Sequence, residues 1–114
     1  MTAIKDKKAL EEKIEKMQLI EQSMQGFLVQ KQSFQMQLSE TESALKELET
    51  AGEVHKIVGN IMVKAEKEEV KKELASKKDV LGLRIKTLEK QEGRLREQAS
   101  AIQKEVLGEN KDEE

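Results

Sequence analysis

Whole classes of side chain are missing from this chain. It contains no Cys, Pro, Trp or Tyr, and its only aromatic residues are two phenylalanines. Without cysteine there can be no disulfide, thiolate metal site or cysteine nucleophile, and such a chain fits a reducing compartment. Folded domains of this length normally use more aromatic residues, so a broad globular core is not expected.

The chain also lacks a dominant charge and a long apolar run. Its 21 Lys and Arg nearly balance its 23 Asp and Glu, giving a net charge of -2. This balance predicts no electrostatic surface for nucleic acid or anionic lipid. No apolar run approaches the roughly 18 residues that span a bilayer, and the first ten residues lack the apolar region of a signal peptide. We therefore expect a cytoplasmic protein that binds neither nucleic acid nor membrane.

Charged residues make up 39% of the chain, which leaves a coiled coil or disorder as the main possibilities. The first half decides between them, because apolar residues recur there at alternating spacings of three and four. A repeat of 3.5 residues over this length predicts supercoiling against a partner helix. The twelve seam positions are Leu10, Lys13, Met17, Ile20, Met24, Phe27, Lys31, Phe34, Leu38, Thr41, Leu45 and Leu48. Nine of them are apolar, and the exceptions are Lys13, Lys31 and Thr41.

The second half repeats this pattern, interrupted only by Lys78 and Glu92. Its apolar seam is formed by Leu74, Leu81, Ile85, Leu88, Leu95, Ala99, Ile102 and Val106. We predict coiled-coil helices over residues 5–51 and 66–107, with Gly52 and Gly108 as C-caps and a frayed tail over 108–114. Each arm is about 60 Å long by helix rise. Folding back about Gly59 pairs residues whose numbers sum to roughly 118.

Three mid-helix glycines, Gly26, Gly82 and Gly93, allow two interpretations. In the predicted register Phe27 and Phe34 lie near Gly93 and Gly82, so that large side chains would face missing ones. Alternatively, each glycine simply loosens its helix, at about 1 kcal/mol relative to alanine. The sequence leaves both interpretations open.

Residues 53–64, between the arms, change to a β pattern. Two β-branched runs flank Gly59-Asn60, which predicts a hairpin with a two-residue type II′ turn. An isolated hairpin is marginal in water, and the apolar stripes of the arms are already used. We expect other chains to complete the sheet, through Val54, Ile57, Val58, Gly59, Asn60, Ile61 and Val63. The alternative is a hairpin folded down on its own helix ends.

Nothing in the sequence predicts catalysis. His55 is the only histidine, and no acidic residues complete a ligand set or a triad around it. There is no glycine-rich phosphate loop, and the carboxylates are spread over solvated helix faces. We therefore expect no enzyme activity, no metal site and no cofactor.

The hairpin sequence, Val54 to Lys64, with a strand ending in Val-Gly followed by an apolar strand ending in Val-Lys, resembles the β-type subunits of prefoldin. The resemblance covers nearly the whole chain, and its unadorned length is similar to that of archaeal subunits. It implies an antiparallel two-helix coiled coil whose hairpin joins an oligomeric β-barrel, in a hexamer of two α-type and four β-type subunits. It further implies ATP-independent holding of unfolded proteins at the helix tips and their delivery to a group II chaperonin.

The tips have no motif, so their residues are predicted from physics. A surface that holds many clients needs apolar groups near the free ends, where unbranched methionine adapts well. The candidates are Ile4, Leu10, Ile14, Met17, Ile102, Val106 and Leu107. For Leu10, Met17 and Ile102, packing in the seam is the simpler role. The alternative function is a structural adaptor or tether, which shares the arms but does not need an apolar sheet edge.

Overall fold

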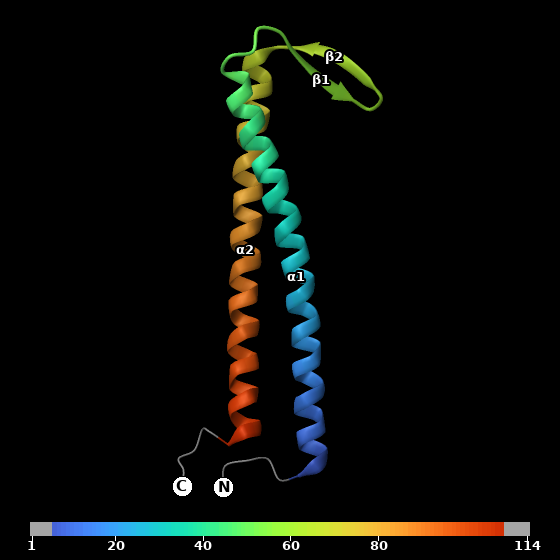
Figure 1. The fold of residues 1–114 in the computed structure, drawn as a ribbon, viewed down its shortest axis with the longest axis vertical. Helices are drawn as coiled ribbons and strands as arrows, with labels where there is room; N and C mark the ends of the chain where they lie inside the picture. The colour runs from blue at the N-terminus through green and yellow to red at the C-terminus, as the bar shows by residue number, and fades with distance from the viewer. Residues whose placement is uncertain (1–5, 109–114) are drawn as a thin grey trace. The chain divides into compact units, whose positions relative to one another are not determined.

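The fold is two long helices joined by a β-hairpin (Figure 1). A computed structural model describes residues 6–108; the predicted tip residue Ile4 and most of the predicted tail lie outside them. Helix α1 spans Lys7–Leu48, strands β1 and β2 span Val54–Val58 and Ile61–Ala65, and helix α2 spans Lys67–Leu107. The predicted fold class, a mainly α chain with a central antiparallel hairpin, is confirmed.

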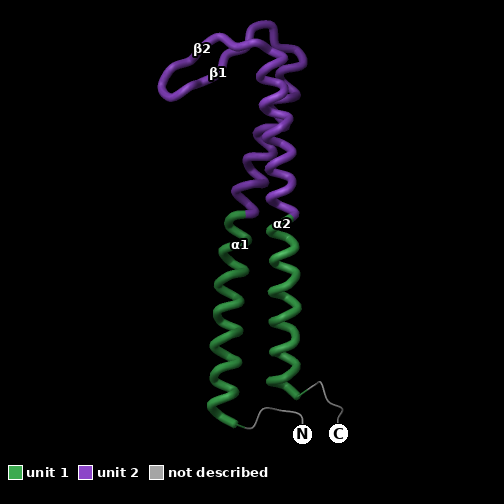
Figure 2. Tube along the Cα trace, turned by 180° about the vertical axis from the view of Figure 1, so that it is seen from behind, with its two compact units in different colours: residues 1–30, 87–114 green, residues 31–86 purple. Residues whose placement is uncertain are grey.

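The chain divides into two compact units (Figure 2). The first combines Met1–Gln30 with Thr87–Glu114 and contains the ends of both helices near the chain termini. The second, Lys31–Lys86, contains the remaining helix segments and the hairpin.

Helix α1 begins with an Asp6 cap, whose Oδ1 accepts a hydrogen bond from the Lys8 backbone N–H at 3.0 Å. It ends at Leu48, three residues before the predicted boundary. There the backbone N–H groups of residues 49–51 each bond the carbonyl three residues earlier, at 3.3 Å. These tight turns end the helix without a left-handed residue. Gly52 does not have a positive φ, so the prediction that it caps α1 is wrong.

Helix α2 ends as predicted, at a glycine in the left-handed conformation. Gly108 has φ 75, and its N–H bonds the carbonyl oxygen of Lys104 at 2.8 Å. This is the single bond of the αL cap, which glycine adopts without steric cost. At the other end, Glu68 and Glu69 place negative charge in the first turn, where the helix dipole favours it.

The predicted heptad seam of α1 matches the burial pattern. All twelve of its positions are buried or half-buried, because the 3.5-residue repeat keeps them on one face. In the first unit, Ile20, Leu88 and Ile102 are buried between the helices. Lys13, one of the polar seam positions, forms an ion pair with Glu105 at 3.2 Å. The numbers of this pair sum to the predicted 118.

The second unit has its own buried seam. Leu48, Leu81 and Ile85 are buried there, as is Thr41, whose hydroxyl donates to the Gln37 carbonyl oxygen at 2.8 Å. That bond satisfies the polar group inside an apolar seam. Two contacts join the helices at levels close to the predicted register. Lys78 forms an ion pair with Glu42 at 3.7 Å, and the guanidinium carbon of Arg84 lies 5.6 Å from the ring centroid of Phe34.

The glycines do not make room for phenylalanine. A Cβ atom built on Gly26, Gly82 or Gly93 meets nothing within 4 Å. No large side chain therefore occupies the space that these glycines leave, and the interpretation of glycine facing phenylalanine is wrong. The glycines remain as local losses of helix propensity, which cost about 1 kcal/mol each.

Candidate functional site

The hairpin turn has the predicted geometry. Val58 pairs with Ile61 across the two-residue loop of Gly59 and Asn60. Gly59 has φ 62, whereas no described residue other than glycine has a positive φ, so Asn60 does not. Positive φ at the first loop position only is the pattern of a type II′ turn. The turn fixes the register, and hence the face on which each side chain lies.

One hairpin face presents Ile57 and Met62 as a cross-strand pair. These side chains are 71% and 67% exposed. Both side chains are far more exposed than the buried apolar side chains of the helical seam, which are of the same chemical type. His55 and Lys64 pair next to them and give this face a polar end toward the helices.

The opposite hairpin face is graded along its length. Near the helices it is half-buried, at Val54, Lys56, Val63 and Ala65. At the turn it is open, with Val58 52% and Ile61 64% exposed. No residue of the two strands is buried, so the hairpin does not fold down onto its own helix ends (Figure 1).

The strand edges are open as well. In the described chain the sheet consists of β1 and β2 alone. The outer edge of each strand therefore presents backbone N–H and C=O groups that pair with no further strand. Two open edges beside exposed apolar side chains form a surface suited to adding strands from other chains.

Met62 belongs to this surface but was missing from the sequence prediction. The signal was present, because a two-residue loop places Met62 directly opposite Ile57. The prediction favoured β-branched residues, which are typical of strands, and methionine is not one of them.

The predicted tip residues fall into three groups. Ile102 is buried, and Leu10, Met17 and Val106 are half-buried, so these four contribute to the seam. Ile14 and Leu107 are 46% and 56% exposed and lie outside the seam. Ile14 and Leu107 meet Met17 and Val106 along one groove, which Leu10 does not line.

This groove runs between the helices within the first unit. Its end near the chain termini is lined by Ile14, Met17, Gln18, Glu21, Gln103, Val106 and Leu107. It continues as a hollow of about 340 Å³ lined by Met17, Ile20, Glu21, Met24, Gln25, Leu28, Glu92, Arg96 and Ala99. Met17 and Glu21 line both parts, so the two parts are adjacent.

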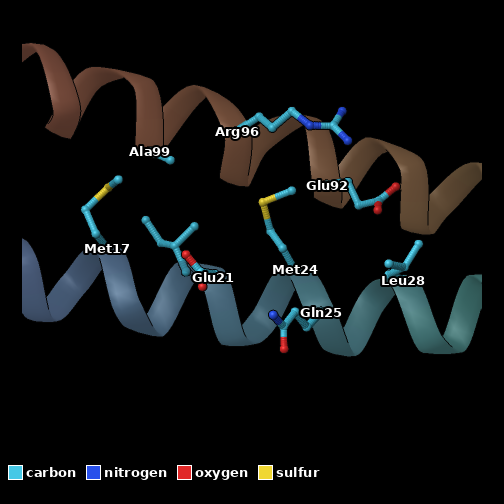
Figure 3. Close-up of a pocket in the computed structure, with 9 residues that line it drawn as sticks. Met17, Glu21, Met24, Gln25, Leu28, Glu92, Arg96 and Ala99 are labelled. Atoms are coloured by element: carbon cyan, nitrogen blue, oxygen red, sulfur yellow. The ribbon is translucent and has the colours of Figure 1, made fainter.

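The inner part of the groove depends on a small seam residue. In Figure 3, Met17 and Met24 point from α1 toward α2, where Ala99 offers only a methyl group. The mismatch leaves the methionine side chains accessible from one side. Met24 and Leu28 were not predicted as site residues; alanine at a seam position opposite methionine was the signal that could have found them.

The described residues hold no other obvious chemistry. Among residues 6–108, no group of three or more His, Asp or Glu is placed to hold a metal ion. Neither described helix has an apolar stretch long enough to cross a membrane. The hairpin surface and the groove are therefore the two candidate sites.

Comparison with known proteins agrees with this architecture. A profile of prefoldin subunits matches residues 11–112. The chain belongs to the prefoldin subunit family. It is 40% identical over 96 residues to prefoldin subunit beta from Archaeoglobus fulgidus, covering 82% of this chain and 83% of the relative. It is also 40% identical over 100 residues to prefoldin subunit beta from Sulfurisphaera tokodaii, covering 85% and 80%.

A solved structure extends the match to three dimensions. The crystal structure of the prefoldin beta subunit from Thermococcus strain KS-1 superposes with a TM-score of 0.85 at 28% identity. The match covers 99% of this chain and 100% of that one. The resemblance to β-type subunits predicted from the hairpin is thereby confirmed, and the chain is a chaperone subunit of a family whose members assemble with other prefoldin subunits.

Proposed function

We propose that this chain is the β-type subunit of an ATP-independent holdase, which binds unfolded polypeptides and delivers them to a group II chaperonin. In this proposal the assembly is a cytoplasmic hexamer of two α-type and four β-type subunits. The observation that carries the proposal is the pair of open apolar sites, one on the hairpin and one in the groove between the helix ends.

The hairpin is the proposed assembly surface. Ile57, Val58, Ile61 and Met62 are each at least half exposed in the isolated chain. Fully burying such a side chain contributes roughly 1.5 to 3 kcal/mol, and the open strand edges supply backbone hydrogen bonds to an added strand. The same features would promote aggregation if no partner covered them.

The groove in the first unit is the proposed client site. It combines flexible methionines with exposed Ile14, Leu28 and Leu107. Unbranched thioether side chains adapt to many apolar partners, as a holdase requires. Each contact is weak, but several copies in one assembly raise the effective concentration of sites and yield useful, reversible holding.

The competing function is a structural tether, and the hairpin is the feature that distinguishes a tether from a holdase subunit. A tether would use the helices to recruit specific partners and would not need exposed apolar side chains on a sheet. The high exposure of Ile57 and Met62 favours an assembly hub.

Two measurements test the proposal. Light scattering of the chain mixed with an α-type subunit is expected to give the mass of a hexamer. A variant lacking residues 1–13 and 106–114 loses Val106 and Leu107 from the groove but keeps its inner part, so it is expected to assemble and to suppress aggregation of an unfolded test protein less well than the intact chain. Full protection by that trimmed complex would rule out capture at the helix ends.

A further inference from the structure

The hairpin is not held in place by an apolar core. The buried side chains of the second unit, Thr41, Leu48, Leu81 and Ile85, all belong to the helices. None of the residues from 49 to 65, which form the connection and the two strands, is buried. Apolar packing therefore restrains the hairpin only at its half-buried base.

Three lysine side chains add polar contacts at this junction. Lys67, in the first turn of α2, donates to the Ala51 carbonyl oxygen at 3.1 Å. Lys64, on β2, lies 3.6 Å from a carboxylate oxygen of Glu53. Lys56, on β1, reaches Glu73 on α2, with its Nζ 3.4 Å from Oε2. Of these contacts, the last connects a strand directly to a helix.

Lys56 occupies an unusual position for a charged residue. It lies between Val54 and Val58 on the half-buried face, opposite Val63. A solvated lysine would fit better on an exposed position of this strand, such as that of Ile57. Its placement on the face that leans toward α2 brings its ammonium group to Glu73, in the second turn of α2.

We propose that Lys56 and Glu73 are positioning residues, whose ion pair holds the hairpin at the angle in which it can join other subunits. The inference rests on the proposed assembly function. A hairpin that samples many angles must lose that freedom when it assembles, whereas a hairpin already held by the pair loses less.

The effect is modest but measurable. The two side chains are 39% and 55% exposed, and an exposed ion pair contributes roughly 0.2 to 1 kcal/mol. Its loss is therefore expected to weaken assembly about 1.4- to fivefold per subunit. The loss should be smaller at high salt, because exposed charges are then screened.

The key variant is Glu73→Gln, because it removes the charge on α2 and leaves the hairpin sequence intact. Glu42→Gln is its matched control, since it removes the 3.7 Å pair with Lys78 between the helices of the same unit. The charge exchange Lys56→Glu with Glu73→Lys restores an ion pair with reversed polarity, and a role based on charge pairing predicts rescue.

Hairpin orientation can be measured directly in the isolated chain. Since the chain has no cysteine, Asn60→Cys and Ser76→Cys provide two unique sites for spin labels, one at the turn and one on α2. Pulsed electron paramagnetic resonance is expected to give a narrow distance distribution for the parent and Glu42→Gln, a broader one for Glu73→Gln, and a narrow one for the exchanged pair.

Assembly with an α-type subunit is then titrated for the same variants without labels. We expect weaker assembly for Glu73→Gln and recovery in the exchanged pair. The proposal is overturned if Glu73→Gln leaves the distance distribution unchanged, if assembly is unaffected despite a broader distribution, or if the exchanged pair rescues neither. Failure of the parent chain to assemble would instead contradict the proposed function, while the distance measurement would still decide whether the ion pair orients the hairpin.

Discussion

The helical seam and the hairpin contain similar apolar residues, but these residues are buried to different extents. In each unit, seam residues such as Leu81 and Ile102 are buried by the facing helix of the same chain, at 2% and 4% exposure. Ile57 and Met62 on the hairpin remain more than half exposed. The single chain therefore buries its own seam, whereas the apolar side chains of the hairpin need further strands to cover them. Stability and assembly should accordingly respond to different mutations.

The strongest effect on stability is expected in the seam. Leu81→Ala removes a side chain that is 2% exposed, and such truncations cost about 2 to 5 kcal/mol. Thermal unfolding followed by circular dichroism should show a large loss of stability. Ile57→Ala on the hairpin is the control, and an equal loss of stability there would contradict the distinction between the two regions.

Filling the groove should reduce client capture without harming the fold. Ala99→Leu is expected to occupy the hollow beside Met17 and Met24. Loss of one contact of about 1.4 kcal/mol corresponds to tenfold weaker binding. Ala101→Leu is the matched control, because residue 101 is exposed and does not line the groove. Aggregation suppression at equal concentrations of complex measures the difference, and equal protection by both variants would exclude the groove as a capture site.

A smaller gain is expected at the mid-helix glycines. A Cβ at Gly82 meets nothing within 4 Å, so Gly82→Ala should stabilise α2 by about 1 kcal/mol through helix propensity. Chemical denaturation measures this gain. Destabilisation would show that the glycine serves a close approach that the structure does not contain.

Nucleotide is expected to have no effect. No glycine-rich phosphate loop occurs in the sequence, so ATP should change neither client capture nor release by the isolated complex. An ATPase rate that follows the pure subunit, and disappears when the subunit is mutated, would contradict this prediction.

The sequence predicted the helices and their pairing well, because a 3.5-residue repeat and equal arms leave little freedom. Lys13–Glu105 and Phe34–Arg84 both fall on the predicted sum of 118. The turn at Gly59 was equally predictable, since a two-residue loop between β-branched runs has few solutions.

Other features depend on local fit that periodicity does not encode. Glycine and phenylalanine at the same level suggested complementary packing, but side-chain direction decides such contacts, and here the space beside the glycines is open. The inner part of the groove is lined by Met24 and Leu28 from one helix and by Ala99 from the other, so it is a property of a pair of helices rather than of one repeat. The contact between Lys56 and Glu73 depends on the hairpin angle, for which the sequence pattern carries no signal.

The most direct test of the account is the combined mass and helix content of a chain with Ile57→Lys and Ile61→Lys. These substitutions place one charge on each face of the hairpin, where assembly would bury it without a partner. We predict an unchanged helical circular dichroism spectrum, together with loss of the assembled mass when the variant is mixed with an α-type subunit. A full-size complex formed by this variant would contradict the claim that the hairpin is the assembly surface.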